Sequence, residues 1–261
     1  FMAVGLKTLP TLDIVAGVRV GTASAGIKKP GKLDLVIVEI AEGSKIASAF
    51  TRNQFCAAPV QIARKHLVDS AARYLLINTG NANAGTGERG RNDALACCEA
   101  LAALTAVKPQ AVVPFSTGVI GEPLPVGKIT DALQQALDDL AEDGWNRAAT
   151  GIMTTDTLPK GVSKKIVIDG KTITITGIVK GAGMIKPNMA TMLSYIATDA
   201  AVDGIRLQKI FSHAVEHSFN RITVDGDTST NDSAILIATG KSGVTINDSN
   251  TSEFEDAVTA V

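Results

Sequence analysis

Hydrophobic residues in this chain of 261 residues alternate with polar ones in some stretches and recur at helical spacing in others. Alternation is typical of half-buried strands, and a recurrence every three to four residues is typical of amphipathic helices. Alternation and short apolar runs predict strands over residues 15–23, 33–40, 45–50, 74–78, 111–115, 164–168, 171–176, 192–198 and 234–238. Helical spacing predicts helices over residues 59–72, 92–104, 129–140 with an extension to 145, 207–218 and 252–260.

The order of these elements favours a layered α+β fold. Residues 28–32 read as a turn between the first two strands, and residues 45–50 add a third strand to an antiparallel start. Asp169–Gly170, between two alternating runs, is a strong signal for a tight hairpin. Strands and helices are mixed without regular β–α–β alternation, and no repeat or long linker interrupts them. The pattern therefore argues against a doubly wound sheet.

Two polar loops match ligand-binding motifs only in part. Gly85, Gly87 and Gly90 have the spacing of a dinucleotide fingerprint, but polar residues separate them from the preceding strand and the expected acidic residue is absent. Residues 225–233 begin like a calcium-binding loop, but no glutamate occupies its twelfth position. We interpret both as ordinary loops.

Composition narrows the possible partners. An apolar share of 45% with 20% charged residues is typical of a core-forming chain, and the net charge of −1 gives no electrostatic case for nucleic acid or an anionic membrane. No run approaches the roughly 20 apolar residues of a membrane span. Translation is expected to start at Met2, and the opening residues lack the features of a secretory signal.

The three cysteines predict free thiols in a reducing compartment, and hence a cytoplasmic protein. Cys97 and Cys98 fall within an apolar helix and are expected to be small core residues rather than metal ligands. His213 and His217 have a spacing that could bind a metal, but no acidic partner accompanies them in the sequence. They and His66 are expected at a helix surface or interface.

The most informative stretch is residues 179–193. Gly181 and Gly183 permit close backbone approach, and Pro187 stiffens the chain before Thr191, which opens an apolar run. Such a stretch could present Thr191 as a reactive group, or it could be a glycine-rich turn before a buried strand. Local pattern alone favours the turn.

Two other features bear on that choice. Residues 116–121 follow a short strand and could bind an oxyanion through backbone amides, or form a plain turn. A threonine hydroxyl needs an adjacent base to act as a nucleophile. Cleavage of the chain before Thr191 would free an α-amine, whose pKa of about 7.7–8.0 suits that role without a histidine.

Residues 180–193 resemble the signature of the ornithine acetyltransferase family of arginine biosynthesis, with Ala190–Thr191 at the family's self-cleavage bond. Four further stretches match the family in the same order: residues 81–87, 116–121, 152–157 and 225–232. The resemblance therefore covers essentially the whole chain. It implies a layered α/β/β/α sandwich of the self-cleaving, DmpA-like type.

The resemblance also implies an activity. The precursor would cut itself between Ala190 and Thr191 into two pieces that stay associated as an α2β2 assembly. Thr191 would then carry an acetyl group from N-acetylornithine to glutamate by a ping-pong route without a cofactor or metal, and some members also accept acetyl-CoA. Thr117 and Gly118 match the family's oxyanion-hole pair, and Thr154, Lys180 and Thr191 match its substrate contacts.

These matches divide the chain into an α piece, residues 1–190, and the start of a β piece, residues 191–261. The last helix has no stop signal, and family members continue beyond this point with an acidic substrate contact, so a further part of the β piece is expected. Two alternatives stay open. One is a related hydrolase or aminopeptidase in which water deacylates Thr191, and the other is a non-catalytic domain whose glycine-rich loops bind an anion.

Overall fold

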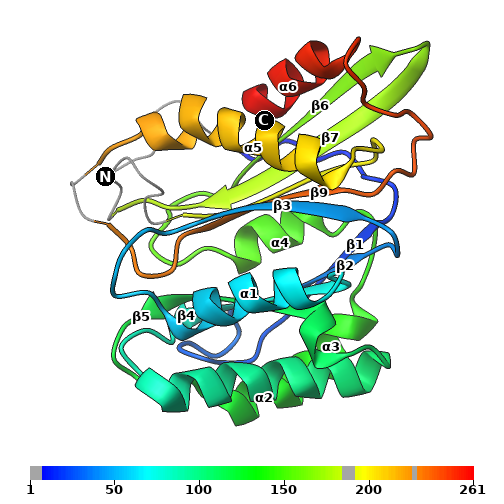
Figure 1. The fold of residues 1–261 in the computed structure, drawn as a ribbon. Helices are drawn as coiled ribbons and strands as arrows, with labels where there is room; N and C mark the ends of the chain where they lie inside the picture. Colours follow the sequence, from blue (N-terminus) through cyan, green and yellow to red (C-terminus); the bar gives the residue numbers. More distant parts are fainter. Residues whose placement is uncertain (1–7, 184–191, 225–227) are drawn as a thin grey trace.

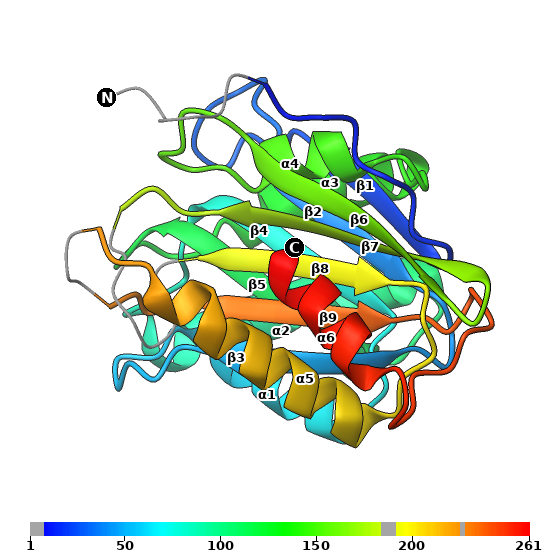
Figure 2. The same cartoon turned by 90° about the horizontal axis from the view of Figure 1, so that it is seen from above.

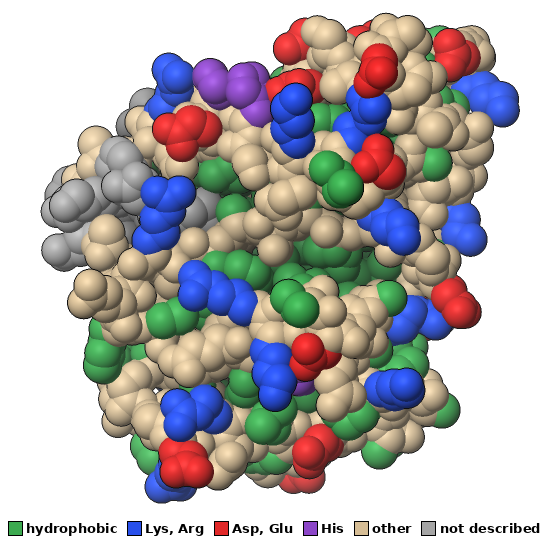
Figure 3. Space-filling model, in the orientation of Figure 1, with side chains coloured by type: hydrophobic (Ala, Val, Ile, Leu, Met, Phe, Trp, Pro, Cys, Tyr) green, Lys and Arg blue, Asp and Glu red, His purple; other side chains and the backbone are tan. Residues whose placement is uncertain are grey.

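Two β-sheets lie face to face with helices covering their outer faces, as the computed structural model shows (Figure 1). The structure describes residues 8–183, 192–224 and 228–261. Positive and negative side chains are scattered over the face drawn in Figure 3, in keeping with the small net charge. The layered α+β sandwich expected from the sequence is confirmed.

The first sheet has four strands in the order β1, β2, β4, β5. Their bounds are Val18–Ala23 for β1, Leu35–Ile40 for β2, Tyr74–Asn81 for β4 and Val112–Val119 for β5. Neighbours pair antiparallel except β4 and β5, which run parallel. Two helices, α2 (Gly87–Thr105) and α3 (Val126–Asp138), pack their apolar faces on the outer side of this sheet.

The second sheet has five strands in the order β3, β9, β8, β7, β6. Their bounds are Lys45–Phe50 for β3, Ser233–Ala238 for β9, Leu193–Thr198 for β8, Lys171–Lys180 for β7 and Lys160–Ile168 for β6. Its outer face is covered by α5 (Gly204–His217) and α6 (Thr251–Ala260), which lie across the strands in Figure 2.

The inner faces of the sheets bury a shared core. Phe115 of β5 and Tyr195 of β8 meet edge to face with their ring centroids 5.3 Å apart. Two helices contribute to this layer, α1 (Ala58–Asp69) and α4 (Trp145–Gly151), and the Trp145 side chain is completely buried. Short 3₁₀ turns at Pro109–Ala111 and Phe219–Arg221 complete the described elements. Among the described residues, no helix is long and apolar enough to cross a membrane.

Local chemistry explains several boundaries. The predicted hairpin joins β6 to β7 through Asp169 and Gly170, whose φ angles of 51° and 72° suit the tight turn that matches strand twist. Asp203 caps α5 by accepting a hydrogen bond from the Arg206 amide at 2.9 Å.

Two predictions about the elements are wrong. Residues 45–50 do not extend the antiparallel start, because β3 lies in the second sheet and pairs with β9 nearly 200 residues later. The helix predicted over residues 129–145 ends at Asp138, and Trp145 starts the separate helix α4. Between the two, Ala141 exchanges backbone hydrogen bonds with Val20 of β1, which draws the chain out of the helix.

The two sheets bring several strand ends to one end of the molecule. Parallel β4 and β5 both finish there, at Asn81 and Val119. In the second sheet, Lys180 at the end of β7 pairs with Leu193 at the start of β8, and Leu193 pairs with Ser233 at the start of β9. The chain therefore leaves β7 and enters β8 at the same end of the sandwich, next to the ends of β4 and β5.

Candidate active site

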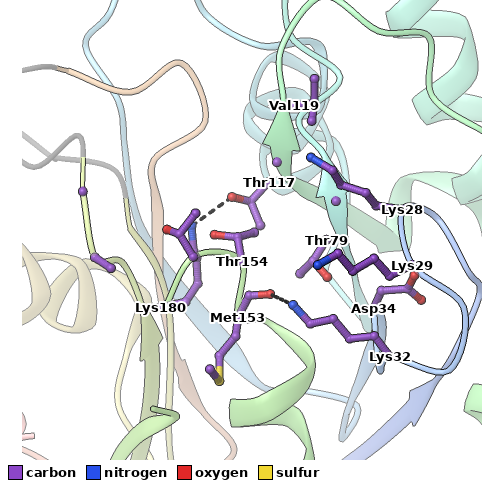
Figure 4. Close-up of a pocket in the computed structure, with 15 residues that line it drawn as sticks. Lys28, Lys29, Lys32, Asp34, Thr79, Thr117, Val119, Met153, Thr154 and Lys180 are labelled. Carbon is purple, nitrogen blue, oxygen red and sulfur yellow. Dashed lines mark hydrogen bonds between the residues drawn. The ribbon is translucent and has the colours of Figure 1, made fainter. Parts of the chain in front are cut away.

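A cavity of about 690 Å³ lies at this end of the molecule (Figure 4). It is lined by residues from both sheets and from three loops: Lys28, Lys29, Lys32, Asp34, Thr79, Gly80, Thr117, Gly118, Val119, Met153, Thr154, Thr155, Lys180, Ala182 and Gly183. The fold thus joins segments that are more than 150 residues apart in the sequence around one space.

Four of the site residues expected from the sequence line this cavity: Thr117, Gly118, Thr154 and Lys180. Thr117 and Gly118 lie near the end of β5, Lys180 ends β7, and Thr154 follows α4. Ala190 and Thr191 lie outside the described residues, so their expected roles stay predictions. The described chain on either side of them, Gly183 and Met192, belongs to the connection between β7 and β8.

Thr117 and Lys180 are joined directly. The Lys180 ammonium donates a hydrogen bond of 3.0 Å to Thr117 Oγ1, and both side chains are buried (Figure 4). A hydroxyl that accepts a bond from a cation keeps its own proton available and becomes a stronger donor. Thr117 can therefore donate to a developing negative charge in the cavity.

Burial and neighbouring charges have opposite effects on the pKa of Lys180. Only 3% of the residue is exposed, and this burial lowers the pKa of Lys180 below its usual value of 10.5. The negative charges of Asp156 and Asp232 act in the opposite direction, and the nearby Lys160 adds to the lowering. Lys180 is thus a cation in a poorly hydrated place, which suits a carboxylate ligand.

Gly118 lies where no side chain fits. Its φ angle is 140°, and a Cβ would lie 2.5 Å from the Asn81 amide nitrogen and closer still to the Gly80 backbone. This contact occurs where the register of β4 and β5 shifts at Gly80 and Asn81. Glycine thereby lets the end of β5 approach β4 closely at the cavity wall.

Buried asparagines support this wall, and the sequence did not identify them as site residues. Asn78 Oδ1 accepts a 2.6 Å hydrogen bond from Ser116 Oγ, and Asn81 donates to the carbonyls of Glu122 and Pro123. Asn83 donates at 2.8 Å to the carbonyl of Gly90 in α2. The asparagine-rich stretch 81–87 was part of the resemblance, and its described role is to hold the loops behind the cavity.

A second support comes from the loop before β9. The Asn231 amide donates to the carbonyl oxygens of Ala82 and Ser116, at 2.6 and 2.9 Å. Its neighbour Asp232 accepts a 2.8 Å bond from the backbone amide of Met192. This loop therefore ties the end of β5 to the start of the segment that enters β8. It falls within the stretch that resembles a calcium loop at its start, of which residues 225–227 lie outside the described residues.

Three lysines on the loop between β1 and β2 face the cavity from the side opposite Lys180 (Figure 4). The Asp34 carboxylate shapes this loop by accepting bonds of 2.7 Å from the amides of Ala25 and Ile27. Lys32 donates to the Met153 carbonyl at 3.1 Å. The sequence marked residues 28–32 only as a turn, because nothing local shows that a turn faces a distant cavity.

Other reactive side chains lie away from the cavity. Cys97 and Cys98 are buried in the core beneath α2 as predicted, and burial raises the pKa of Cys97 to about 12. His66 is buried at the interface of α1 and β5, where its Nδ1 lies 2.7 Å from the Val112 carbonyl oxygen, so of the two expected positions it takes the interface.

His213 and His217 stack on α5, at a ring-centroid distance of 3.9 Å. His213 also lies 2.5 Å from Glu255 of α6, an acidic neighbour that the local sequence pattern does not indicate. No group of three or more potential metal-binding side chains is found in residues 8–183, 192–224 and 228–261.

Comparison with known proteins gives consistent matches. A sequence model of the ArgJ family matches residues 19–261. The arginine biosynthesis bifunctional protein ArgJ of Pseudomonas fluorescens is 63% identical over 93% of this chain, and that of Methylococcus capsulatus is 54% identical over 95%. These alignments cover 60% and 61% of the two relatives, so the chain spans about 60% of their length.

Solved structures agree in fold. The ArgJ protein of Bacillus halodurans is 31% identical, with a TM-score of 0.59 over 67% of this chain and 92% of that chain. An ornithine acetyltransferase from Mycobacterium tuberculosis, solved with ornithine, is 33% identical with a TM-score of 0.59 over 69% and 96%. An aminopeptidase of Ochrobactrum anthropi with a variant Ntn-hydrolase fold, 13% identical, has a TM-score of 0.57 over 94% and 81%, which shows likeness of fold alone.

Proposed function

This chain belongs to the ArgJ family, and on that premise we propose that it is part of an acetyltransferase that moves an acetyl group from N-acetylornithine to glutamate in arginine biosynthesis. The observation that carries the proposal is the meeting of Thr117, Gly118, Thr154 and Lys180 around one cavity. The sequence assigned these residues by motif alone, without information on their distances.

The proposed nucleophile is Thr191, freed by cleavage of the Ala190–Thr191 bond. Its α-amine takes the Oγ proton as Oγ attacks the acetyl carbonyl carbon of N-acetylornithine. The C–N bond then breaks, ornithine leaves with that proton on its nitrogen, and the acetyl group stays on Oγ as an ester. The neutral α-amine of glutamate attacks the ester carbon and gives a proton to the α-amine of Thr191. The ester C–Oγ bond then breaks, Oγ takes that proton, and N-acetylglutamate leaves with Thr191 restored.

Each attack places a negative charge on the carbonyl oxygen. The Thr117 hydroxyl and the Gly118 amide are the proposed donors to that oxygen. The polarisation of Thr117 by Lys180, through the 3.0 Å hydrogen bond, supports this role. Removing one such donor typically lowers turnover about 10²–10³-fold.

Substrate binding is proposed to depend on charge. N-acetylornithine and glutamate both carry an α-carboxylate, and glutamate carries a second carboxylate. Four lysines line the cavity against the single carboxylate of Asp34, which makes the described wall cationic. Lys180 and Thr154 are the proposed contacts to the α-carboxylate.

The proposal also covers the assembly of the two pieces and the source of the acetyl group. The two pieces produced by cleavage are proposed to stay together as an α2β2 assembly in the cytoplasm. Transfer through an acyl-threonine needs no cofactor or metal, and acetyl-CoA is a possible second donor. The pairing of β7 with β8, which come from opposite sides of the proposed cut, supports the association, because all of β8 pairs with residues 175–180 of β7.

The first experiment asks whether the chain cuts itself. The product of the whole gene, purified with and without Thr191→Ala, is run on a denaturing gel and its pieces are sequenced from their N-termini. We expect a new N-terminus at Thr191 in the wild type and an uncut Thr191→Ala protein. A wild type that stays uncut would contradict the proposal and favour a non-catalytic anion-binding domain.

The second experiment separates transfer from hydrolysis. N-acetylornithine is incubated with the processed protein, and ornithine, acetate and N-acetylglutamate are measured with and without glutamate. We expect rapid release of ornithine only when glutamate is present, with one N-acetylglutamate formed per ornithine. Release of acetate at a rate independent of glutamate would instead identify a hydrolase.

A further inference from the structure

The described site contains a buried carboxylate to which the proposed reaction gives no role. Asp156 lies on the loop between α4 and β6, and its side chain is completely buried. It does not line the cavity, but it lies beside two residues that do, Thr154 and Lys180. A buried charge needs close compensation, so its contacts indicate what it holds in place.

Asp156 binds the backbone at both proposed substrate contacts. Its Oδ1 accepts a 2.8 Å hydrogen bond from the amide of Gly181, the residue directly after Lys180. Its Oδ2 accepts a longer bond, 3.3 Å, from the amide of Thr154 itself. One carboxylate thus connects the end of β7 to the loop that carries Thr154.

Lys160 provides the compensating charge. Its ammonium lies 2.5 Å from Asp156 Oδ1, while 30% of the lysine side chain stays exposed. Burial by itself would raise the pKa of Asp156. The hydrogen bonds from Lys160 and Gly181, with the charges of Lys160 and Lys180, outweigh it and lower the pKa below its usual value. Asp156 is therefore an anion held by three donors.

We propose that Asp156, paired with Lys160, is a positioning residue that fixes the end of β7 against the Thr154 loop and so sets the distance between the two substrate contacts. The expected effect of Asp156 on catalysis rests on the acetyl transfer proposed above. The anchoring of the Gly181 backbone by Asp156 does not depend on that reaction, and it is measured separately by deuterium exchange. A displacement of about 1 Å at a reacting centre can cost about a hundredfold in rate.

The fold offers a control carboxylate that contacts the same strand from the residue after β8. Asp199 is also a buried carboxylate, and it accepts a 2.9 Å bond from the amide of Thr174. Thr174 and Lys180 both belong to β7, but Asp199 does not line the cavity. Asp199→Asn therefore alters a buried carboxylate that contacts β7 without disturbing the cavity wall.

The experiment compares Asp156→Asn, Lys160→Met, Lys160→Arg and Asp199→Asn with the wild type, all as products of the whole gene. Three quantities are measured: deuterium exchange at the Gly181 amide, kcat and KM for acetyl transfer, and the thermal unfolding midpoint. Asparagine has one acceptor oxygen in place of two, so it cannot satisfy all three donors of Asp156. Lys160→Met keeps the carboxylate and alters a partly exposed side chain, so it serves if Asp156→Asn fails to fold.

We expect Asp156→Asn to exchange the Gly181 amide at least tenfold faster and to lower kcat about a hundredfold. Lys160→Met should have smaller effects in the same direction, and Lys160→Arg should restore most of kcat because it keeps the charge. In Asp199→Asn, exchange at Gly181 and kcat should stay at wild-type values.

The proposal is overturned if the Asp156 and Lys160 variants lose stability while Gly181 exchange and kcat match the wild type, since Asp156 would then be a structural residue only. It is equally overturned if Lys160→Met and Lys160→Arg behave alike. A wild type without acetyl transfer would refute the proposed function, and Gly181 exchange would still decide whether Asp156 is the anchor.

Discussion

At the scale of single residues, the cavity depends on one pair of side chains with opposite hydrogen-bonding roles. Lys180 can only donate, and Thr117 both accepts from it and keeps a proton to donate. The pair is buried, so water competes little with either bond. The Thr117 hydroxyl is therefore oriented as a hydrogen-bond donor in the cavity wall. The Lys180 ammonium that orients it is removed from water, which is energetically unfavourable.

Replacing Thr117 by alanine should lower kcat for acetyl transfer about 10²–10³-fold with little change in KM, because the lost donor acts on the transition-state oxygen. The measurement is steady-state kinetics on the processed protein. Thr22→Val is a matched control, since Thr22 is buried in β1 and its hydroxyl donates to Asp139 away from the cavity. If Thr117→Ala and Thr22→Val have equal kcat values, Thr117 is not an oxyanion donor.

Replacing Lys180 by methionine should weaken substrate binding while leaving the protein at least as stable as the wild type at pH 7. Burial lowers the folded-state pKa of Lys180, so the unfolded state binds more protons between that pKa and 10.5. The cost of the buried charge is therefore complete below the folded-state pKa and disappears as the pH rises towards 10.5.

Thermal unfolding of both proteins across this range checks the prediction for Lys180. The stability advantage of Lys180→Met should shrink as the pH rises through the window. An advantage that grows with pH, or a variant less stable than the wild type at pH 7, would show that the ammonium is stabilised by its surroundings.

At the scale of elements, the site depends on how closely the ends of β4 and β5 approach each other. Gly118 makes the approach possible, and the asparagines of β4 and of the following loop hold the chain on either side. Position 118 requires glycine because a Cβ would overlap the backbone of Gly80 and Asn81. In a turn such as that at Gly121, where a Cβ would meet nothing within 4 Å, it is needed only for its positive φ of 83°.

This contrast predicts different costs for two alanine substitutions, one at the end of β5 and one in the loop that follows it. Gly121→Ala should lower the free energy of unfolding by about 1–2 kcal/mol, the usual cost of a left-handed conformation. Gly118→Ala should cost that amount plus about 1–3 kcal/mol for the overlap with Gly80 and Asn81. Urea denaturation measures both. Equal losses would mean that the backbone of β5 moves away freely.

At the scale of the whole molecule, the two sheets are joined by an apolar layer that contains polar atoms without partners. Among the described residues, the Tyr195 hydroxyl and the Trp145 ring nitrogen are buried without a hydrogen bond. Burial raises the pKa of Tyr195 well above its usual value, so the phenol stays neutral. What Tyr195 contributes to this layer is therefore the contact of its ring with Phe115, not its hydroxyl.

Tyr195→Phe should therefore raise the free energy of unfolding by about 1 kcal/mol, because an unpaired buried polar group costs roughly 1–3 kcal/mol. The ring and its edge-to-face contact are kept. Chemical denaturation of the two proteins provides the measurement, with Tyr74→Phe as the control. The Tyr74 hydroxyl donates to Glu39 at 2.9 Å, so its loss should lower stability. A loss of stability in Tyr195→Phe would mean that its hydroxyl is satisfied in solution.

Much of the local structure could be predicted because it depends on near neighbours. Periodicity and turn chemistry predict the Asp169–Gly170 hairpin, the buried cysteines of α2 and strand β8, which ends at Thr198. The sheet to which β3 belongs and the end of α3 were predicted wrongly. Each depends on a partner distant in the sequence, which periodicity does not register.

The sequence by itself determined the family and the layered fold, and it predicted Thr117, Gly118, Thr154 and Lys180 as site residues, because motifs retain the residue types that a backbone and a chemistry require. Only the tertiary structure showed that Asp156 accepts hydrogen bonds from the amides of Thr154 and Gly181 and that a loop of lysines faces the same cavity. Those relations are distances between segments far apart in the chain. They exist only once the two sheets have stacked and their strand ends have met.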